Sequence, residues 1–97
     1  MQQITYSQLK QWQTDKHPHL LIDVREREEH TAFNIGGTLI PLSEIIQQMD
    51  LFRSELPIVV YCKRGIRSQI AIQRLQRKIP SATFYNLQNG IWHLLTT

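Results

Sequence analysis

The chain has 97 residues, 41% of them hydrophobic, which is enough for one domain with a single core. Eleven lysines and arginines against 8 acidic residues give a net charge of +3, and no apolar run approaches the roughly 20 residues of a membrane span. The single cysteine excludes an internal disulfide and the amino terminus lacks the features of a secretory signal, so we expect one cytoplasmic, monomeric domain over residues 1–97 without membrane contact.

Helical and strand-like segments alternate in the first half of the chain. Thr5 and Gln8 have the spacing of a capping box, which predicts a helix that begins at Tyr6. Pro41 stops an apolar strand, and Ser43 is a suitable cap for a helix after it. The predicted elements, in chain order, are a helix at 6–13, a buried strand at 20–24, a short acidic helix at 26–32, a strand at 38–40 and a helix at 43–49.

The same alternation continues in the second half. Residues 57–61 are apolar and rich in Ile and Val, as in a strand that is buried on both faces. Residues 66–79 have helical spacing, with apolar side chains on one side and arginine and lysine on the other. A strand at 83–86 completes the sheet. Together these elements predict an α/β fold, a doubly wound domain with a central, mostly parallel sheet of about five strands flanked by helices.

Cys62 stands between the strand at 57–61 and the helix at 66–79. This position predicts that it lies at the carboxyl edge of the sheet, where open α/β sheets bind their ligands. Gly65 tolerates a positive φ, which would let the backbone N–H groups of residues 63–68 turn toward an anion. The spacing is therefore typical of an anion-binding loop.

Positive charge surrounds this cysteine in the sequence. Lys63, Arg64 and Arg67 follow Cys62 directly, and the amino-terminal dipole of the next helix adds to their effect. Such surroundings favour the thiolate over the thiol. The alternative is an inert core cysteine, which has no need of a cationic loop. The sequence thus predicts that Cys62 is a nucleophile.

The order of four motifs resembles that of the rhodanese-like sulfurtransferases. Residues 62–68, Cys-Lys-Arg-Gly-Ile-Arg-Ser, resemble the active-site loop of that family. Residues 21–30 are similar to its Asp-Val-Arg signature with an acidic turn, residues 35–42 to its His-Ile-Pro-Gly-Ala segment with a later Ile-Pro-Leu, and residues 85–92 to its Leu-x-Gly-Gly closing motif. The resemblance covers nearly the whole chain and implies the rhodanese-like fold. It implies Cys62 as the catalytic residue and a substrate-binding loop of Lys63, Arg64, Gly65, Ile66, Arg67 and Ser68.

Two segments depart from the family's pattern. Residues 33–37 read Phe-Asn-Ile-Gly-Gly where the family usually has Gly-His-Ile-Pro-Gly, and Asn89 replaces the first of two closing glycines. The Asn-Ile-Gly-Gly form is most similar to rhodanese domains joined to the carboxyl end of ubiquitin-activating-like enzymes of molybdopterin and thiamine biosynthesis. This resemblance implies a small, acidic, ubiquitin-like sulfur-carrier protein as an acceptor.

The length of the loop separates two chemistries that share this fold. Cell-cycle dual-specificity phosphatases resemble rhodaneses but place five residues between the cysteine and the phosphate-binding arginine. Here four residues separate Cys62 from Arg67, and Ser68 stands where the longer loop has its arginine. The shorter loop fits a sulfur-sized group and would crowd a phosphate. A phosphatase or an arsenate reductase is therefore disfavoured, while a non-catalytic rhodanese-like binding or sensing module stays as the main alternative.

The resemblance implies persulfide transfer on Cys62. The thiolate would take sulfane sulfur from thiosulfate or from a persulfide donor protein and pass it to a thiophilic acceptor, such as cyanide in vitro. Residues 1–62 hold five basic and eight acidic side chains, whereas residues 63–97 hold six basic and none acidic. The cationic rim would steer such anions and attract an acidic partner. No motif supports nucleic-acid binding, and the four histidines have no metal-ligand pattern, so neither a metal nor a cofactor is expected.

Asp23 and Arg25 end a strand whose carboxyl edge faces the same side as Cys62. In a functional interpretation, Asp23 accepts hydrogen bonds from loop groups and Arg25 pairs with a nearby carboxylate, which would hold the loop in shape. The alternative is an ordinary strand end with solvated charges. The family resemblance favours a structural role for this pair over direct catalysis.

Overall fold

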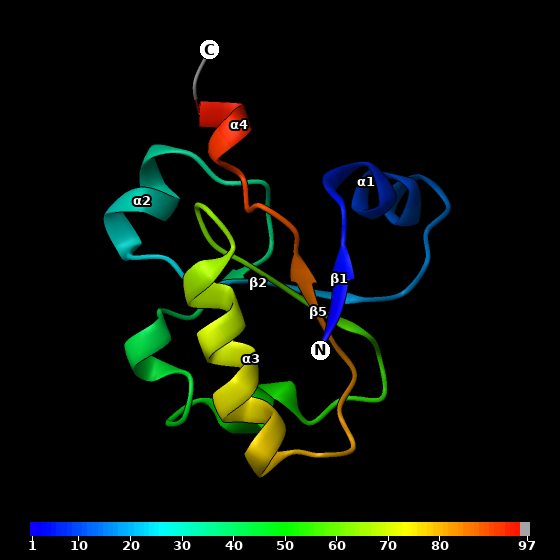
Figure 1. Ribbon diagram of the computed structural model, residues 1–97, viewed down its shortest axis with the longest axis vertical. Helices are drawn as coiled ribbons and strands as arrows, with labels where there is room; N and C mark the ends of the chain where they lie inside the picture. Colours follow the sequence, from blue (N-terminus) through cyan, green and yellow to red (C-terminus); the bar gives the residue numbers. More distant parts are fainter. Residues whose placement is uncertain (96–97) are drawn as a thin grey trace.

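A parallel sheet of five strands lies at the centre of the protein in the computed structural model, which describes residues 1–95 (Figure 1). The spatial order of the strands is β1-β5-β4-β2-β3, and each neighbouring pair is parallel. The predicted α/β class and parallel sheet are thus confirmed. The strands are β1 (Gln2–Ile4), β2 (Leu20–Asp23), β3 (Thr38–Leu39), β4 (Ile58–Tyr61) and β5 (Phe84–Leu87).

Helices cover both faces of this sheet. Figure 1 shows α3 (Ile66–Lys78) and α1 (Tyr6–Thr14) on opposite sides of it, and the apolar core is divided accordingly into two clusters. Along β4, Ile58 and Val60 pack in the cluster under α3, whereas Val59 and Tyr61 pack in the cluster under α1. Burial on both faces explains the continuous apolar run of this strand. The helices are α1 (Tyr6–Thr14), α2 (Arg27–Ala32), α3 (Ile66–Lys78) and α4 (Trp92–Leu95), with two 3-10 helices, η1 (Leu42–Glu44) and η2 (Met49–Phe52).

The start of α1 is encoded by its first turn, as predicted. The Gln8 N–H donates to Thr5 Oγ1 at 3.1 Å, and the Thr5 N–H donates to Gln8 Oε1 at 2.9 Å. These two bonds complete the capping box and satisfy two N–H groups that the helix leaves open. Within residues 1–95, no helix has both the length and the apolar composition that crossing a membrane would require.

The predicted helix at 43–49 is wrong. The chain there forms η1 followed by turns, and Ser43 lies inside η1 without a capping bond. Ile45 and Phe52 are both fully buried against the sheet, while Ile46 is 39% exposed. Two adjacent β-branched residues also lower the helix propensity of this stretch. Packing of separate apolar side chains therefore outweighs the cap signal.

Strand β1 has no counterpart among the elements placed from the sequence. It has three residues, of which two are exposed glutamines and only Ile4 is buried. It pairs with β5 alone, with Gln3 opposite Asn86, and so forms an edge of the sheet. A short polar edge strand carries no hydrophobic alternation, which is why the sequence pattern misses it.

Candidate active site at Cys62

Cys62 directly follows β4, at the carboxyl edge of the parallel sheet. Its side chain is buried, with 1% exposure, and α3 begins four residues later at Ile66. Between them, Gly65 has a φ of 86°, in the left-handed region that glycine adopts without steric cost. This reversal turns the loop back over the sulfur.

Three polar groups of the loop contact the sulfur. The N–H groups of Gly65 and Ser68 donate to Cys62 Sγ, at 3.1 and 3.4 Å, and Ser68 Oγ lies 3.3 Å from it. Two converging backbone donors form an anion-binding concavity of the kind expected from the sequence. Such donors stabilise a negatively charged sulfur better than a neutral thiol.

Behind Ser68, a buried chain of hydrogen bonds leads to the edge strand. Ser68 Oγ donates to Asn86 Oδ1 at 2.5 Å, and Asn86 Nδ2 donates to Gln3 Oε1 at 2.9 Å. Ser68 and Asn86 are both buried. Since a hydroxyl has one proton, Ser68 accepts from the Cys62 thiol in this arrangement and must turn to donate to a thiolate. The sequence analysis missed Asn86, although a polar residue at an inward-facing strand position was the available signal.

Arg67 makes an ion pair with α2. Its two terminal guanidinium nitrogens donate to Glu29 Oε1 and Oε2 at 2.6 and 3.0 Å. Glu29 Oε1 also accepts the Glu26 N–H at 3.0 Å and so completes the capping box of α2. Hydrogen bonds from Arg67 lower the pKa of Glu29 to about 2, so that this carboxyl is ionised at neutral pH. Arg67 thus borders the site, but a carboxylate of the protein already binds its two terminal nitrogens.

The remaining cations of the loop line a small pocket beside the cysteine. This pocket, of about 160 Å³, is bounded by Cys62, Lys63, Arg64, Ile66 and Arg67. The Arg64 guanidinium lies over the Trp92 ring, 4.9 Å from its centroid, in a cation–π contact. Arg64 also lines a neighbouring hollow of about 360 Å³ together with Asn89, Trp92 and His93. The two hollows therefore adjoin at Arg64.

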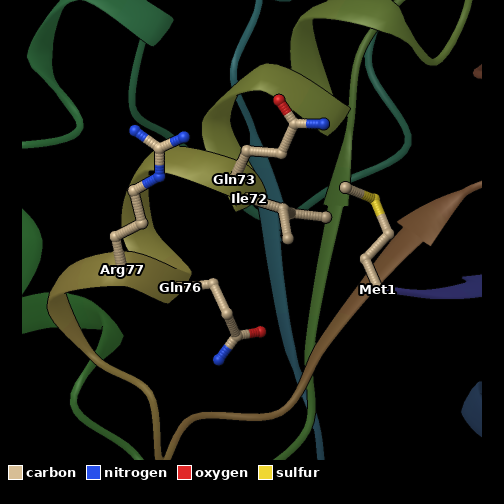
Figure 2. Close-up of a pocket in the computed structure, with 5 residues that line it drawn as sticks. All are labelled: Met1, Ile72, Gln73, Gln76 and Arg77. Atoms are coloured by element: carbon tan, nitrogen blue, oxygen red, sulfur yellow. The ribbon is translucent and has the colours of Figure 1, made fainter.

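A larger hollow lies along the carboxyl-terminal half of α3, where Met1 approaches that helix (Figure 2). It measures about 570 Å³ and is lined by Met1, Ile72, Gln73, Gln76 and Arg77. None of these side chains is a nucleophile or an acid. Size alone therefore does not identify the site, and the chemistry favours the small pocket at Cys62. Among residues 1–95, no three His, Cys, Asp or Glu side chains are grouped so as to hold a metal ion.

Asp23 and Arg25 form a buried ion pair at the end of β2. Arg25 Nε and one terminal nitrogen donate to the Asp23 carboxylate at 3.0 and 2.8 Å, and the two side chains are 2% and 0% exposed. Burial would raise the pKa of Asp23, but hydrogen bonds from Arg25 and His30 outweigh it and hold the pKa below its ordinary value. Arg25 also donates to the Phe33 carbonyl at 2.6 Å. The pair is not solvated; it ties β2 to the carboxyl-terminal part of α2, the helix that carries Glu29.

Comparison with known proteins identifies the family. The sequence model of the rhodanese-like domain matches residues 5–93. The chain belongs to the rhodanese-like domain family. One curated relative, the adenylyltransferase and sulfurtransferase MOCS3-1 of Drosophila pseudoobscura pseudoobscura, is 38% identical to it over 82 residues. The match covers 76% of this chain and 18% of the relative, so the chain spans about a fifth of such a protein.

Solved structures of rhodanese-like domains have the same fold. The crystal structure of a rhodanese-like domain protein from Staphylococcus aureus matches with a TM-score of 0.83 at 25% identity, over 95% of this chain and 89% of that one. A thiosulfate sulfurtransferase from Pseudomonas aeruginosa matches with a TM-score of 0.82 at 19% identity, over 98% of this chain and 19% of that one. The latter likeness concerns the fold. The family and the fold class predicted from the sequence are therefore confirmed.

The closing segment of this rhodanese-like domain, residues 85–92, is hydrogen-bonded to the backbone of the Cys62 loop. The N–H groups of Ile91 and Trp92 donate to the carbonyls of Cys62 and Lys63, at 3.2 and 2.8 Å. Asn89, where the family usually has glycine, has a φ of 63°. Asparagine is among the few other residues that adopt the left-handed region readily. This departure from the family's pattern thus leaves the turn in place.

Proposed function

We propose that this rhodanese-like domain is a sulfurtransferase in which Cys62 carries sulfane sulfur as a persulfide. The observation that supports this most directly is the pair of backbone donors on the Cys62 sulfur, beside a pocket with three cationic residues. A thiolate and a terminal persulfide are both anionic, and both gain from such preorganised donors. The curated relatives that carry sulfurtransferase in their names support the same reaction class.

The reaction proceeds in two covalent steps. The Cys62 thiolate attacks the outer sulfur of a donor, a new S–S bond forms, and the donor's own bond to that sulfur breaks. With thiosulfate, sulfite leaves with the electron pair; with an alkyl persulfide, the alkyl thiolate leaves. A nucleophilic acceptor then attacks the outer sulfur of the persulfide and returns Cys62 to the thiolate. With cyanide as the acceptor the product is thiocyanate, and neither step needs an external oxidant or reductant.

Intact mass measures the first step directly. After incubation with thiosulfate, the protein is expected to gain about 32 Da, and the gain should disappear on addition of cyanide. The Cys62→Ser variant, whose oxygen cannot form a persulfide, should gain nothing. A parallel incubation with glutathione persulfide tests whether Cys62 takes sulfur from a donor other than thiosulfate.

The opposite result has a definite meaning. If the folded protein shows no added sulfur from either donor while its thiol can still be alkylated, the proposed reaction is wrong for this chain. A non-catalytic binding or sensing module is then the better description. Release of phosphate from a phosphoester would instead indicate the chemistry that the short loop disfavours.

The acceptor we propose is a small, acidic sulfur-carrier protein. Arg64 is exposed at the junction of the two hollows, where an approaching protein would meet its charge. The Arg64→Gln variant should transfer sulfur to such a carrier about tenfold more slowly, because rim charges mainly set the association rate. Transfer to cyanide should change by less than about twofold, since a small ion meets the sulfur directly.

The matched control is Arg74→Gln, which removes the same charge from an exposed position of α3 outside both hollows. The rate of single-turnover sulfur transfer from the preformed Cys62 persulfide is measured at low and at high salt. Salt screens the attraction between the two proteins, so it slows their association and leaves the chemical step unchanged. Equal losses with both acceptors, or equal losses in both variants, would contradict the protein acceptor.

A further inference from the structure

The charge beside Cys62 is less positive than the loop sequence suggests. Arg67, one of three cations in the loop, has both terminal nitrogens bound by Glu29. The two side chains come from different helices and are only about one-third exposed. The carboxylate occupies the fork through which an arginine binds a small oxyanion. An anionic donor must therefore displace Glu29 from this fork or meet an Arg67 whose positive charge the carboxylate balances.

The other two cations do not replace this fork. Arg64 is held over the Trp92 ring, and Lys63 is exposed at the rim of the pocket. The contacts that hold the Cys62 sulfur come from backbone N–H groups and a hydroxyl, which suit a single negative charge on sulfur. These groups serve the Cys62 sulfur itself, so the three oxygens of thiosulfate need further hydrogen-bond donors, which a persulfide of low charge does not.

We propose that Glu29 sets the donor preference of the site, and this inference rests on the proposed sulfurtransferase function. By binding Arg67, Glu29 makes the site select sulfane sulfur donors of low charge, such as alkyl persulfides, over the thiosulfate dianion. Glu29 is a specificity-determining residue in this view, because it acts on the donor through Arg67 rather than by touching the reacting sulfur.

Two alkylating agents measure this effect without sulfur transfer. Iodoacetate and iodoacetamide attach to the same thiolate with loss of iodide, and they differ in one negative charge. The ratio of their rates at Cys62 therefore reports the electrostatics of the site. The Glu29→Gln variant should raise the iodoacetate-to-iodoacetamide ratio at least about threefold, since it leaves the charge of Arg67 unbalanced. Glutamine keeps an oxygen that can accept the Glu26 N–H, so the cap of α2 is retained.

The control is Glu28→Gln, which removes the same charge from an exposed position of the same helix. It should leave the ratio unchanged. Should Glu29→Gln fail to fold, Arg67→Gln tests the same pair from the other side. That variant leaves the Glu29 carboxylate unbalanced and should lower the ratio at least about threefold.

Persulfide formation tests the preference itself. Glu29→Gln should accelerate loading of Cys62 from thiosulfate about fivefold, and loading from 2-hydroxyethyl persulfide, which carries at most one negative charge, by less than about twofold. If sulfur transfer occurs but Glu29→Gln behaves like Glu28→Gln with both donors and both alkylating agents, the donor preference is overturned while the sulfurtransferase function stands. If no variant takes sulfur from either donor, the proposed function fails, and the donor preference fails with it, whatever the alkylation ratio.

Discussion

Replacement of Arg25 by methionine is expected to lower the free energy of unfolding by about 3–5 kcal/mol, as when one partner of a buried ion pair is removed. The Arg25 side chain is 2% exposed, and its guanidinium contacts the Asp23 carboxylate and the Phe33 carbonyl. Methionine fills a similar length but donates no hydrogen bond. The Asp23 carboxylate would then be buried with His30 as its main remaining side-chain partner.

Urea denaturation at pH 7 measures this loss, with Arg53→Met as the control. Arg53 pairs with Asp50 at 3.0 Å, but these side chains are 52% and 91% exposed, so breaking that pair should cost less than about 1 kcal/mol. The measurement is made at pH 7 because the pKa of Asp23 is lowered in the folded protein. The ionised Asp23 stabilises the fold fully at a pH above the ordinary pKa of an aspartate, and this stabilisation is lost as the pH falls through the lowered pKa. Equal losses in the two variants would show that the buried pair does not hold the end of β2.

The local part of the site could be predicted from the sequence. Cys62 and Gly65 lie close together in the chain, and their roles in a strand-to-helix turn follow from short-range patterns: an apolar run, a residue that tolerates positive φ and a helical repeat. The structure places them at the carboxyl end of β4 and at the start of α3. Such signals depend on neighbouring residues, which a single sequence displays.

The long-range part could not be predicted in the same way. Glu29 and Arg67 lie 38 positions apart, and Ser68 and Asn86 lie 18 positions apart. Nothing in either local pattern says that these side chains meet, because the meeting depends on the order of the strands. The sequence therefore predicted Arg67 as a substrate-binding residue, whereas in the structure the carboxylate of Glu29, from another helix, binds it. The consequence is a change in the expected donor rather than in the nucleophile.

Replacement of Gly90 by alanine is expected to distort the Cys62 loop, since the closing segment lies directly against it. Gly90 has a φ of 63°, and a Cβ there would lie far inside van der Waals contact with the carbonyl oxygens of Lys63 and Cys62. Both obstacles are backbone atoms, so either the loop or the closing segment must move. We expect a loss of about 2–4 kcal/mol in the free energy of unfolding, from the left-handed conformation and the overpacking together.

Gly36→Ala separates these two causes. Gly36 also has a positive φ, of 97°, but a Cβ there would meet no atom within 4 Å. This control should therefore cost only about 1–2 kcal/mol, the price of the left-handed conformation. Persulfide loading should be unchanged in Gly36→Ala and about 100-fold slower in Gly90→Ala, because a displacement of about 1 Å in a catalytic group has that effect on rate. A Gly90→Ala variant that loads sulfur as fast as Gly36→Ala would mean that the closing segment does not position the cysteine.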